Sequence, residues 1–271
     1  MEEAIALPTA SIHGADIYYE VQGEGYPLIL IMGLGANIDW WGTGFIKQLA
    51  RHHKVVALDN RGAGRTRTPD GPFRIEDMAA DVAGLMDELS IERADVYGMS
   101  MGGMIAQEFA LTYAERIHRL ILGCTSCGSH QQVMPTPLAA TLLMAAPATL
   151  EEAMEHQAKL LFPDEFVDKN RPLLVESYKV LIRHPMSREN FVRQFGAIQA
   201  WQGSFDRLHA ISCPTLILHG TEDILLPVGN AEILHDHIPG SHLIRYEGCG
   251  HAFTVQMATR VLADIEEFLL S

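Results

Sequence analysis

The sequence contains little cysteine, and the thiols it has form no clear metal-binding pattern. The four cysteines are Cys124, Cys127, Cys213 and Cys249. So few thiols in 271 residues do not make a disulfide framework, and we expect them to be reduced. Cys124 and Cys127 have C-x-x-C spacing, but a structural zinc ion needs a second close pair and the other two cysteines are isolated. Strand-end cysteines are therefore the preferred interpretation, with the roles of Cys124 and Cys127 left open.

Basic residues and long apolar runs are also scarce. The chain has 20 lysines and arginines against 34 aspartates and glutamates, a formal net charge of −14 at pH 7. An acidic surface repels phosphate backbones and anionic lipid headgroups, so nucleic acid and membranes are not expected partners. The amino terminus, Met1-Glu2-Glu3, is acidic where a secretory signal is basic, and no apolar run approaches the ~20 residues of a membrane span. We therefore expect a cytoplasmic protein.

Hydrophobic residues, in contrast, are plentiful at 48% of the chain. This fraction predicts a sizeable packed core, and 271 residues suffice for one large domain with an insertion. Strand patterns fill both ends of the chain, whereas Pro-punctuated amphipathic helices replace them between about residues 130 and 205. The sequence therefore predicts a core domain over 1–129 and 206–271, with a helical cap over 130–205.

The strand patterns predict an α/β fold with a largely parallel sheet. Leu28–Met32 is apolar throughout, which is typical of a strand covered on both faces. Further strands are expected at 15–22, 54–58, 119–123, 214–220 and 242–246. Helices are expected at 75–89, 104–112 and 255–270, and in the cap at 138–146, 150–161, 171–182 and 188–201.

The most informative stretch is a serine between glycines, Gly98-Met-Ser100-Met-Gly102. A strand pattern ends at Gly98 and a helical pattern follows, so Ser100 is expected on a sharp strand-to-helix turn. Such a turn needs small neighbours because the backbone approaches itself closely. The turn exposes the serine hydroxyl and directs the N–H of Met101 toward any oxyanion formed there. The alternative is a serine that merely caps a helix.

A serine nucleophile needs a base, and the base needs an orienting carboxylate. Among thirteen histidines, His251 lies in a glycine-flanked loop just after a late strand. Asp223 follows the preceding strand and is preferred over Glu222 because its shorter stem holds an imidazole in one tautomer. His219, which ends that strand, is interpreted as a packed histidine. The chain order Ser100, Asp223, His251 is the order found in one known fold.

Together these three motifs resemble the α/β-hydrolase superfamily, in its esterase and lactonase branch with a helical cap. The segment Asp59–Thr66 resembles that family's turn after its fourth strand. The resemblance implies a mostly parallel central sheet with helices on both faces, no cofactor and no catalytic metal. It places the oxyanion donors at the backbone N–H groups of Leu34 and Met101. Many members carry His-Gly ahead of that loop, where this chain has Met32-Gly33, and a backbone donor survives the change.

The glycines that follow the first apolar strand do not form a dinucleotide site. Gly33-x-Gly35 lacks the third glycine and the spaced acidic residue of that motif. Next to this loop, tryptophans could wall an acyl pocket, with core packing an equal alternative. The candidate pocket residues are Gly33, Trp40, Trp41, Met144 and Trp201.

The sequence thus predicts a serine hydrolase that cleaves a small, mostly apolar carboxylic ester or lactone through an acyl-enzyme on Ser100. Three alternatives stay open: a carbon–carbon bond hydrolase, a cofactor-free haloperoxidase or perhydrolase, and a ligand receptor that carries the same three side chains. The expected partner is a small-molecule substrate, with a homodimer as one option.

Overall fold

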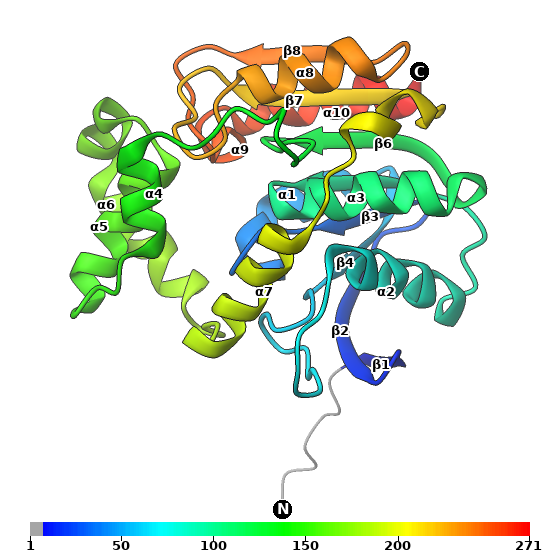
Figure 1. Cartoon of the computed structure of the whole chain (residues 1–271), viewed down its shortest axis with the longest axis horizontal. Coiled ribbons are helices and arrows are strands. Elements are labelled where there is room, and N and C mark those ends of the chain that lie inside the picture. Colours follow the sequence, from blue (N-terminus) through cyan, green and yellow to red (C-terminus); the bar gives the residue numbers. More distant parts are fainter. Residues whose placement is uncertain (1–7) are drawn as a thin grey trace, which may run out of the picture.

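The protein is built around a single eight-stranded sheet (Figure 1). A computed structural model describes residues 8–271, so Met1-Glu2-Glu3 lies outside the described part. The strands are β1 (Thr9–Ile12), β2 (Ala15–Gln22), β3 (Tyr26–Ile31), β4 (His53–Leu58), β5 (Ala94–Met99), β6 (Ile117–Gly123), β7 (Thr215–Gly220) and β8 (His242–Tyr246). Their spatial order is β1-β2-β4-β3-β5-β6-β7-β8. Only the pairings of β2 with β1 and β4 are antiparallel, which confirms the mostly parallel sheet.

Helices cover both faces of the sheet, as the fold class predicts. The core helices are α1 (Thr43–Leu49), α2 (Ile75–Glu88), α3 (Met101–Thr112), α8 (Gly229–His237), α9 (Phe253–Gln256) and α10 (Ala258–Leu270). Short 3-10 helices occur at η1 (Ile38–Trp41), η2 (Ala114–Arg116) and η3 (Phe205–Ala210). Buried residues of α2, α3 and α8 form one hydrophobic cluster, and those of α1, α9 and α10 form the other. The sheet is therefore desolvated on both sides, which accounts for the continuous apolar run in β3.

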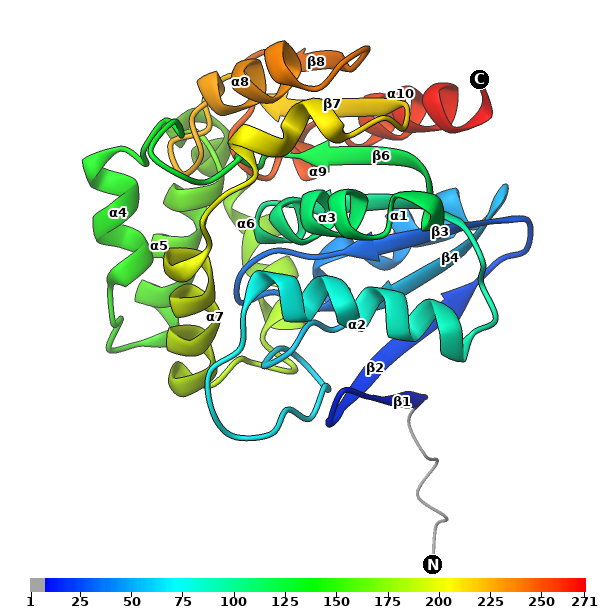
Figure 2. The same cartoon turned by 45° about the vertical axis from the view of Figure 1, so that its right-hand side comes forward.

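Four further helices lie between β6 and β7. They are α4 (Pro137–Met144), α5 (Leu150–Leu161), α6 (Asp164–Leu181) and α7 (Arg188–Ala200). We refer to this inserted helical segment as the cap. Helices α4, α5 and α6 stand together beyond one end of the sheet, toward which the arrows of β6 and β8 point (Figures 1 and 2). Thr136, Thr149 and Ser187 cap α4, α5 and α7 by accepting a backbone N–H three residues on. These side chains fix where three of the four helices begin.

Some elements differ from the sequence expectation. Helix α6 begins at Asp164, earlier than the expected 171, with Asp164 and Glu165 in its first turn. Pro172, a residue that favours the first turn of a helix, lies inside it instead. The expected carboxyl-terminal helix is two helices, α9 and α10. Strand β1 and helix α1, of four and seven residues, are too short to show a clear period in the sequence. Among the described residues, no helix is long and apolar enough to cross a bilayer.

Candidate active site

Four chemically active side chains lie where four neighbouring parallel strands end. Ser100 follows β5, Cys124 follows β6, Asp223 lies just after β7 and His251 lies in the loop after β8. These strands are consecutive in the sheet, so their carboxyl ends meet at one edge. Open parallel sheets place ligands at this edge. The topology therefore gathers residues that are up to about 150 positions apart in the chain into one region.

Ser100 occupies a strained turn between β5 and α3. Its φ angle is 56°, in the left-handed region that few residues other than glycine adopt. Its backbone N–H donates to the Gly123 carbonyl at 2.8 Å, and its carbonyl accepts from the Thr125 hydroxyl at 2.7 Å. A side chain at Gly98 would overlap the Gly102 carbonyl oxygen, and one at Gly102 would overlap the Ile31 carbonyl oxygen. The two glycines thus allow the tight elbow that the sequence pattern predicts.

The imidazole of His251 and the carboxylate of Asp223 are directly paired. His251 Nδ1 lies 2.7 Å from Asp223 Oδ2, and both side chains are buried. The other carboxylate oxygen, Oδ1, accepts the backbone N–H groups of Leu225 and Leu226 at 2.8 and 2.9 Å. His219 Nε2 approaches Asp223 Oδ2 at 3.3 Å and the Leu226 carbonyl at 2.6 Å. These contacts fix the orientation of the carboxylate and hence of the ring of His251.

Glu222, the competing carboxylate, lies elsewhere. Its side chain is exposed, while its backbone N–H donates to the Cys249 carbonyl at 2.8 Å. The chain therefore brings Asp223, and not Glu222, to the imidazole of His251.

The buried charges explain the titration of this pair. Burial alone would raise the pKa of Asp223, but the facing charge of His251 and hydrogen bonds from His219 and His251 outweigh it and lower that pKa. Burial would lower the pKa of His251, but the attraction of Asp223 outweighs it and raises that pKa well above its ordinary value. Burial also raises the pKa of the Cys124 thiol, which is therefore neutral near pH 7. Asp223 accordingly stays ionised through the neutral range.

The second ring nitrogen of His251 faces a thiol. Its Nε2 lies 3.8 Å from Cys124 Sγ, and within residues 8–271 it has no hydrogen bond to the Ser100 hydroxyl. Catalytic hydrogen bonds are often long without substrate and tighten when it binds. Cys124 is a site residue that the sequence interpretation did not include. The available signal was its position after β6, the strand next to the Ser100 strand.

The loop after β3 lies against Ser100. A Cβ atom at Gly33 would be 2.9 Å from Ser100 Cβ and 3.4 Å from its hydroxyl oxygen. Among the described residues, the backbone N–H groups of Leu34 and Met101 have no partner within the chain. An oxyanion hole requires unpaired backbone donors, so these two N–H groups are candidates for that role. The Asn60 side chain donates to the Met32 carbonyl at 2.7 Å and steadies the strand end before this loop.

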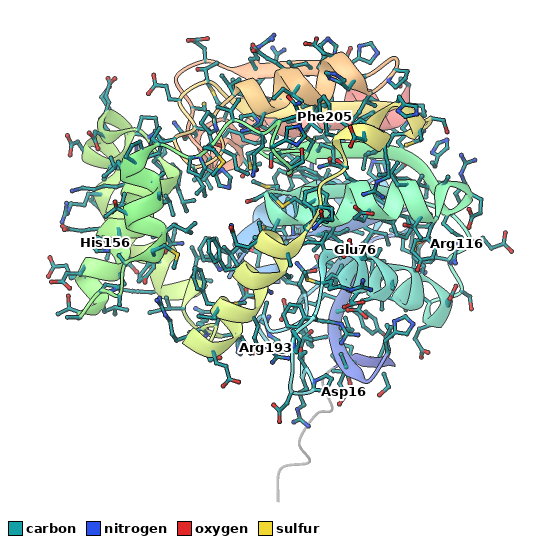
Figure 3. All side chains as sticks on the ribbon, viewed as in Figure 1. Asp16, Glu76, Arg116, His156, Arg193 and Phe205 are labelled. Atoms are coloured by element: carbon teal, nitrogen blue, oxygen red, sulfur yellow. The ribbon has the colours of Figure 1, made fainter. Side chains whose placement is uncertain are left out.

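A cap residue also holds the same loop. Gln194, on α7, is fully buried, and its Oε1 accepts the backbone N–H of Gly35 at 3.0 Å. Its Nε2 donates to the Arg61 carbonyl at 2.7 Å. Nearby, Arg193 donates to the carbonyls of Pro69 and Gly71, at the lower end of α7 in Figure 3. Helix α7 therefore bridges the loop after β3 and the loop after β4.

The candidate pocket residues divide into two groups. Trp41 packs 4.9 Å from the ring of Tyr97 and stacks on Phe45, inside the hydrophobic core. The buried Trp201 donates its indole N–H to Glu108 at 2.7 Å. These contacts favour core packing for both tryptophans. Trp40 is half-buried and Met144 is 47% exposed, whereas Gly33 borders Ser100 as described above.

A cleft of about 950 Å³ lies where α5 and α6 face the loop after β7. Its lining includes Leu161, Phe162, Phe166, Asp223 and Gln256. Ser100 and His251 do not line it, so the cleft marks the boundary of cap and core rather than the position of Ser100.

This geometry agrees with comparisons to known proteins. Residues 26–256 match the alpha/beta hydrolase fold family. The chain is 29% identical over 250 residues, 92% of each sequence, to the candidate carbamate hydrolase RutD of Azorhizobium caulinodans. It superposes on the enol-lactonase of Burkholderia xenovorans LB400 with a TM-score of 0.83 and 25% identity, covering 97% of this chain and 100% of that one. A meta-cleavage product hydrolase from Pseudomonas fluorescens IP01 gives a TM-score of 0.83, 25% identity and 97% coverage of both chains.

The protein is thus an enzyme, of the class that hydrolyses its substrates. It belongs to the α/β-hydrolase fold family.

Proposed function

We propose that this enzyme is a serine hydrolase that cleaves a small, mostly apolar carboxylic ester or lactone through an acyl-enzyme on Ser100. The observation that carries the proposal is the pairing of His251 Nδ1 with Asp223 Oδ2 at 2.7 Å, at the same sheet edge as the elbow of Ser100. A paired imidazole and carboxylate at the same sheet edge as a strained serine are the parts that an acyl-transfer mechanism needs.

In the proposed mechanism, the Ser100 hydroxyl attacks the substrate carbonyl while His251 Nε2 takes its proton. Asp223 holds the imidazole in the tautomer that leaves Nε2 free to accept. The oxyanion receives hydrogen bonds from the Leu34 and Met101 N–H groups, each worth on the order of 3 kcal/mol in the barrier. His251 then returns the proton to the leaving alkoxide, and a water activated by the same imidazole hydrolyses the acyl-enzyme.

The apolar character of the substrate is supported by the cap helix that faces the oxyanion loop. A side chain at Gly35 would meet Phe191 Cδ2 at 3.9 Å, so this ring lies over the loop. Phe191 stacks on Phe195, with ring centroids 6.2 Å apart. Aromatic rings at this position favour an apolar acyl group and exclude water from it.

Hydrolysis of a carbon–carbon bond is the second candidate. The structural similarity to a meta-cleavage product hydrolase supports it, with 97% of both chains covered. The same serine, histidine and carboxylate would serve there. Comparing kcat/KM on a short ester with that on a dienoic ring-fission product separates the two reactions.

The test of the proposal is covalent labelling with a fluorophosphonate probe, followed by mass spectrometry of the labelled peptide. We expect one label per chain, on Ser100, and turnover of a panel of p-nitrophenyl esters that falls as the acyl chain becomes polar. Labelling of another residue, or ester turnover that survives in labelled protein, would contradict the proposal.

A further inference from the structure

Beside the paired Asp223 and His251 lies a thiol that the proposed mechanism does not use. Cys124 is fully buried, and its Sγ is 3.8 Å from His251 Nε2, the nitrogen that must accept the serine proton. Ligand atoms of Cys124, Asp223 and His251 all lie within 4.8 Å of one another. The three side chains come from loops after β6, β7 and β8, so the sheet itself sets their spacing.

We propose that Cys124 and His251 form an inhibitory binding site for a soft divalent cation of the Zn²⁺ class. The ion would bind Cys124 Sγ and His251 Nε2, leaving its remaining positions to water or the Ser100 hydroxyl. Zn–S bonds are about 2.3 Å and Zn–N bonds about 2.0–2.1 Å. With these two bond lengths, the observed 3.8 Å between Cys124 Sγ and His251 Nε2 gives an S–Zn–N angle of about 120°. Tetrahedral coordination therefore needs only a small rotation of one side chain.

The other nitrogen of His251 is already arranged as in a metal site. Histidines that bind metals almost always donate their second ring N–H to a carboxylate or carbonyl, which fixes the ring and increases its basicity. His251 Nδ1 makes this contact with Asp223 Oδ2 at 2.7 Å. Asp223 cannot bind the same ion closely while it holds Nδ1, so its role at the metal site is orientation.

The thiol chemistry decides which ions fit. The Cys124 thiol is neutral near pH 7, so binding converts it to a metal-bound thiolate and releases one proton to solvent. Thiolate and imidazole prefer Zn²⁺ and Cd²⁺, whereas Mg²⁺ and Ca²⁺ prefer oxygen ligands. The bound ion would occupy Nε2 and so remove the base from the reaction. This consequence for turnover rests on the proposed function, but binding itself does not.

The test is therefore a binding measurement, with turnover as a second readout. Purified protein in chelator-treated buffer is titrated with Cd²⁺ while the ultraviolet thiolate-to-metal absorption is recorded. We expect one equivalent to bind to the unaltered chain and to the inactive Ser100→Ala variant. Cys124→Ser and His251→Gln should both lose this band. Cys127→Ser is the matched control, because Cys127 is also buried and its thiol donates to the Gly128 carbonyl, with no hydrogen bond to a histidine among the described residues.

In parallel, Zn²⁺ should inhibit ester turnover reversibly, and a chelator should restore it. In Cys124→Ser, the Zn²⁺ concentration that halves turnover should be at least about tenfold higher than in the unaltered chain. The activity of each protein is expressed relative to its own metal-free value. Mg²⁺ at the same concentrations should have no effect. The proposed site would be overturned if the Cd²⁺ absorption band persisted in folded Cys124→Ser. If Cys124→Ser does not fold, persistence of the band in His251→Gln would overturn it instead. Because the Cd²⁺ titration needs no substrate, its result stands even where ester hydrolysis is absent.

Discussion

The core and the cap of this enzyme are built in different ways. Strands β5 and β7 are buried at every position, and the backbone of Ser100 is hydrogen-bonded to Gly123, Gly103 and Met104. In the cap, by contrast, α4, α5 and α6 each bury a single residue, namely Ala139, Ala158 and Leu174. The core therefore holds Ser100 and Asp223 rigidly, whereas the cap has little hydrophobic anchoring of its own.

The cap nevertheless touches the core at the loops that matter most. Gln194 accepts the backbone N–H of Gly35 in the loop after β3, and the carbonyl of His184 accepts the side-chain N–H of Asn37 at 3.0 Å. On the other side, the Leu161 carbonyl accepts the N–H of Ala252, next to His251, at 3.0 Å. Gln194 is fully buried, so breaking its contact would leave the Gly35 N–H without a partner. These polar contacts therefore tie the cap helices to the loops that carry Gly35 and Ala252.

The largest effect should follow from removing the nucleophile in the core. Ser100→Ala should lower kcat/KM for a short ester on the order of 10⁴-fold, because no other hydroxyl occupies the elbow. This corresponds to about 5 kcal/mol in the barrier. Ser90→Ala is a matched control, since Ser90 also has a left-handed backbone, at φ 52°, but is exposed at the end of α2. Steady-state kinetics on both variants would contradict the role of Ser100 if their losses were alike.

The next largest effect should come from Gly→Ala substitutions, which add one methyl group either to the core or to the cap and change the free energy of unfolding. Gly98→Ala places a Cβ against the Gly102 carbonyl oxygen, a backbone atom that cannot move aside, and should destabilise the fold by about 4 kcal/mol or more. Gly196→Ala makes the same change in α7 of the cap, where no atom lies within 4 Å. It should stabilise the protein by about 0.5–1 kcal/mol through helix propensity.

Chemical denaturation with a linear extrapolation measures both changes. Equal destabilisation by Gly98→Ala and Gly196→Ala would show that the elbow is no more tightly packed than the cap helix.

A medium effect is expected from the glutamine that joins the two parts. Gln194→Met removes the acceptor of the Gly35 N–H and leaves the loop free to shift, so kcat should fall roughly tenfold to hundredfold with little change in KM. Gln107→Met is the control in the core. Gln107 is equally buried and bonds to the Gly103 and Ser126 carbonyls, away from the oxyanion loop.

Both glutamine variants should lose about 1–3 kcal/mol of stability, because each leaves buried partners unpaired. Only Gln194→Met should lower kcat. If kcat fell in proportion to the lost stability in both Gln194→Met and Gln107→Met, Gln194 would have a structural role only.

The same contrast explains what could be predicted from the sequence. Ser100, Asp223 and His251 were identifiable because each lies at or shortly after the end of a strand, and parallel strands bring their ends together whatever their separation in the chain. The role of Gln194 depends on a hydrogen bond across 159 residues, from a helix whose own pattern shows only amphipathicity. Cys124 also follows an apolar strand, but nothing local reveals that its thiol faces an imidazole 127 residues away.

The smallest effect concerns the two adjacent carboxylates after β7, of which one is buried against His251 and the other is exposed. A base must be neutral to accept the serine proton, and Asp223 raises the pKa of His251 well above its ordinary 6.5 against the effect of burial. Activity should therefore fall as the pH drops through that raised pKa, so the acid limb of kcat/KM should lie above pH 6.5. Glu222→Gln removes only a solvated charge and should move this limb by no more than about a few tenths of a unit. The measurement is a pH–rate profile in chelator-containing buffer. A limb at or below pH 6.5, or one that Glu222→Gln shifts by a full unit, would show that the buried pair does not control the titration of the base.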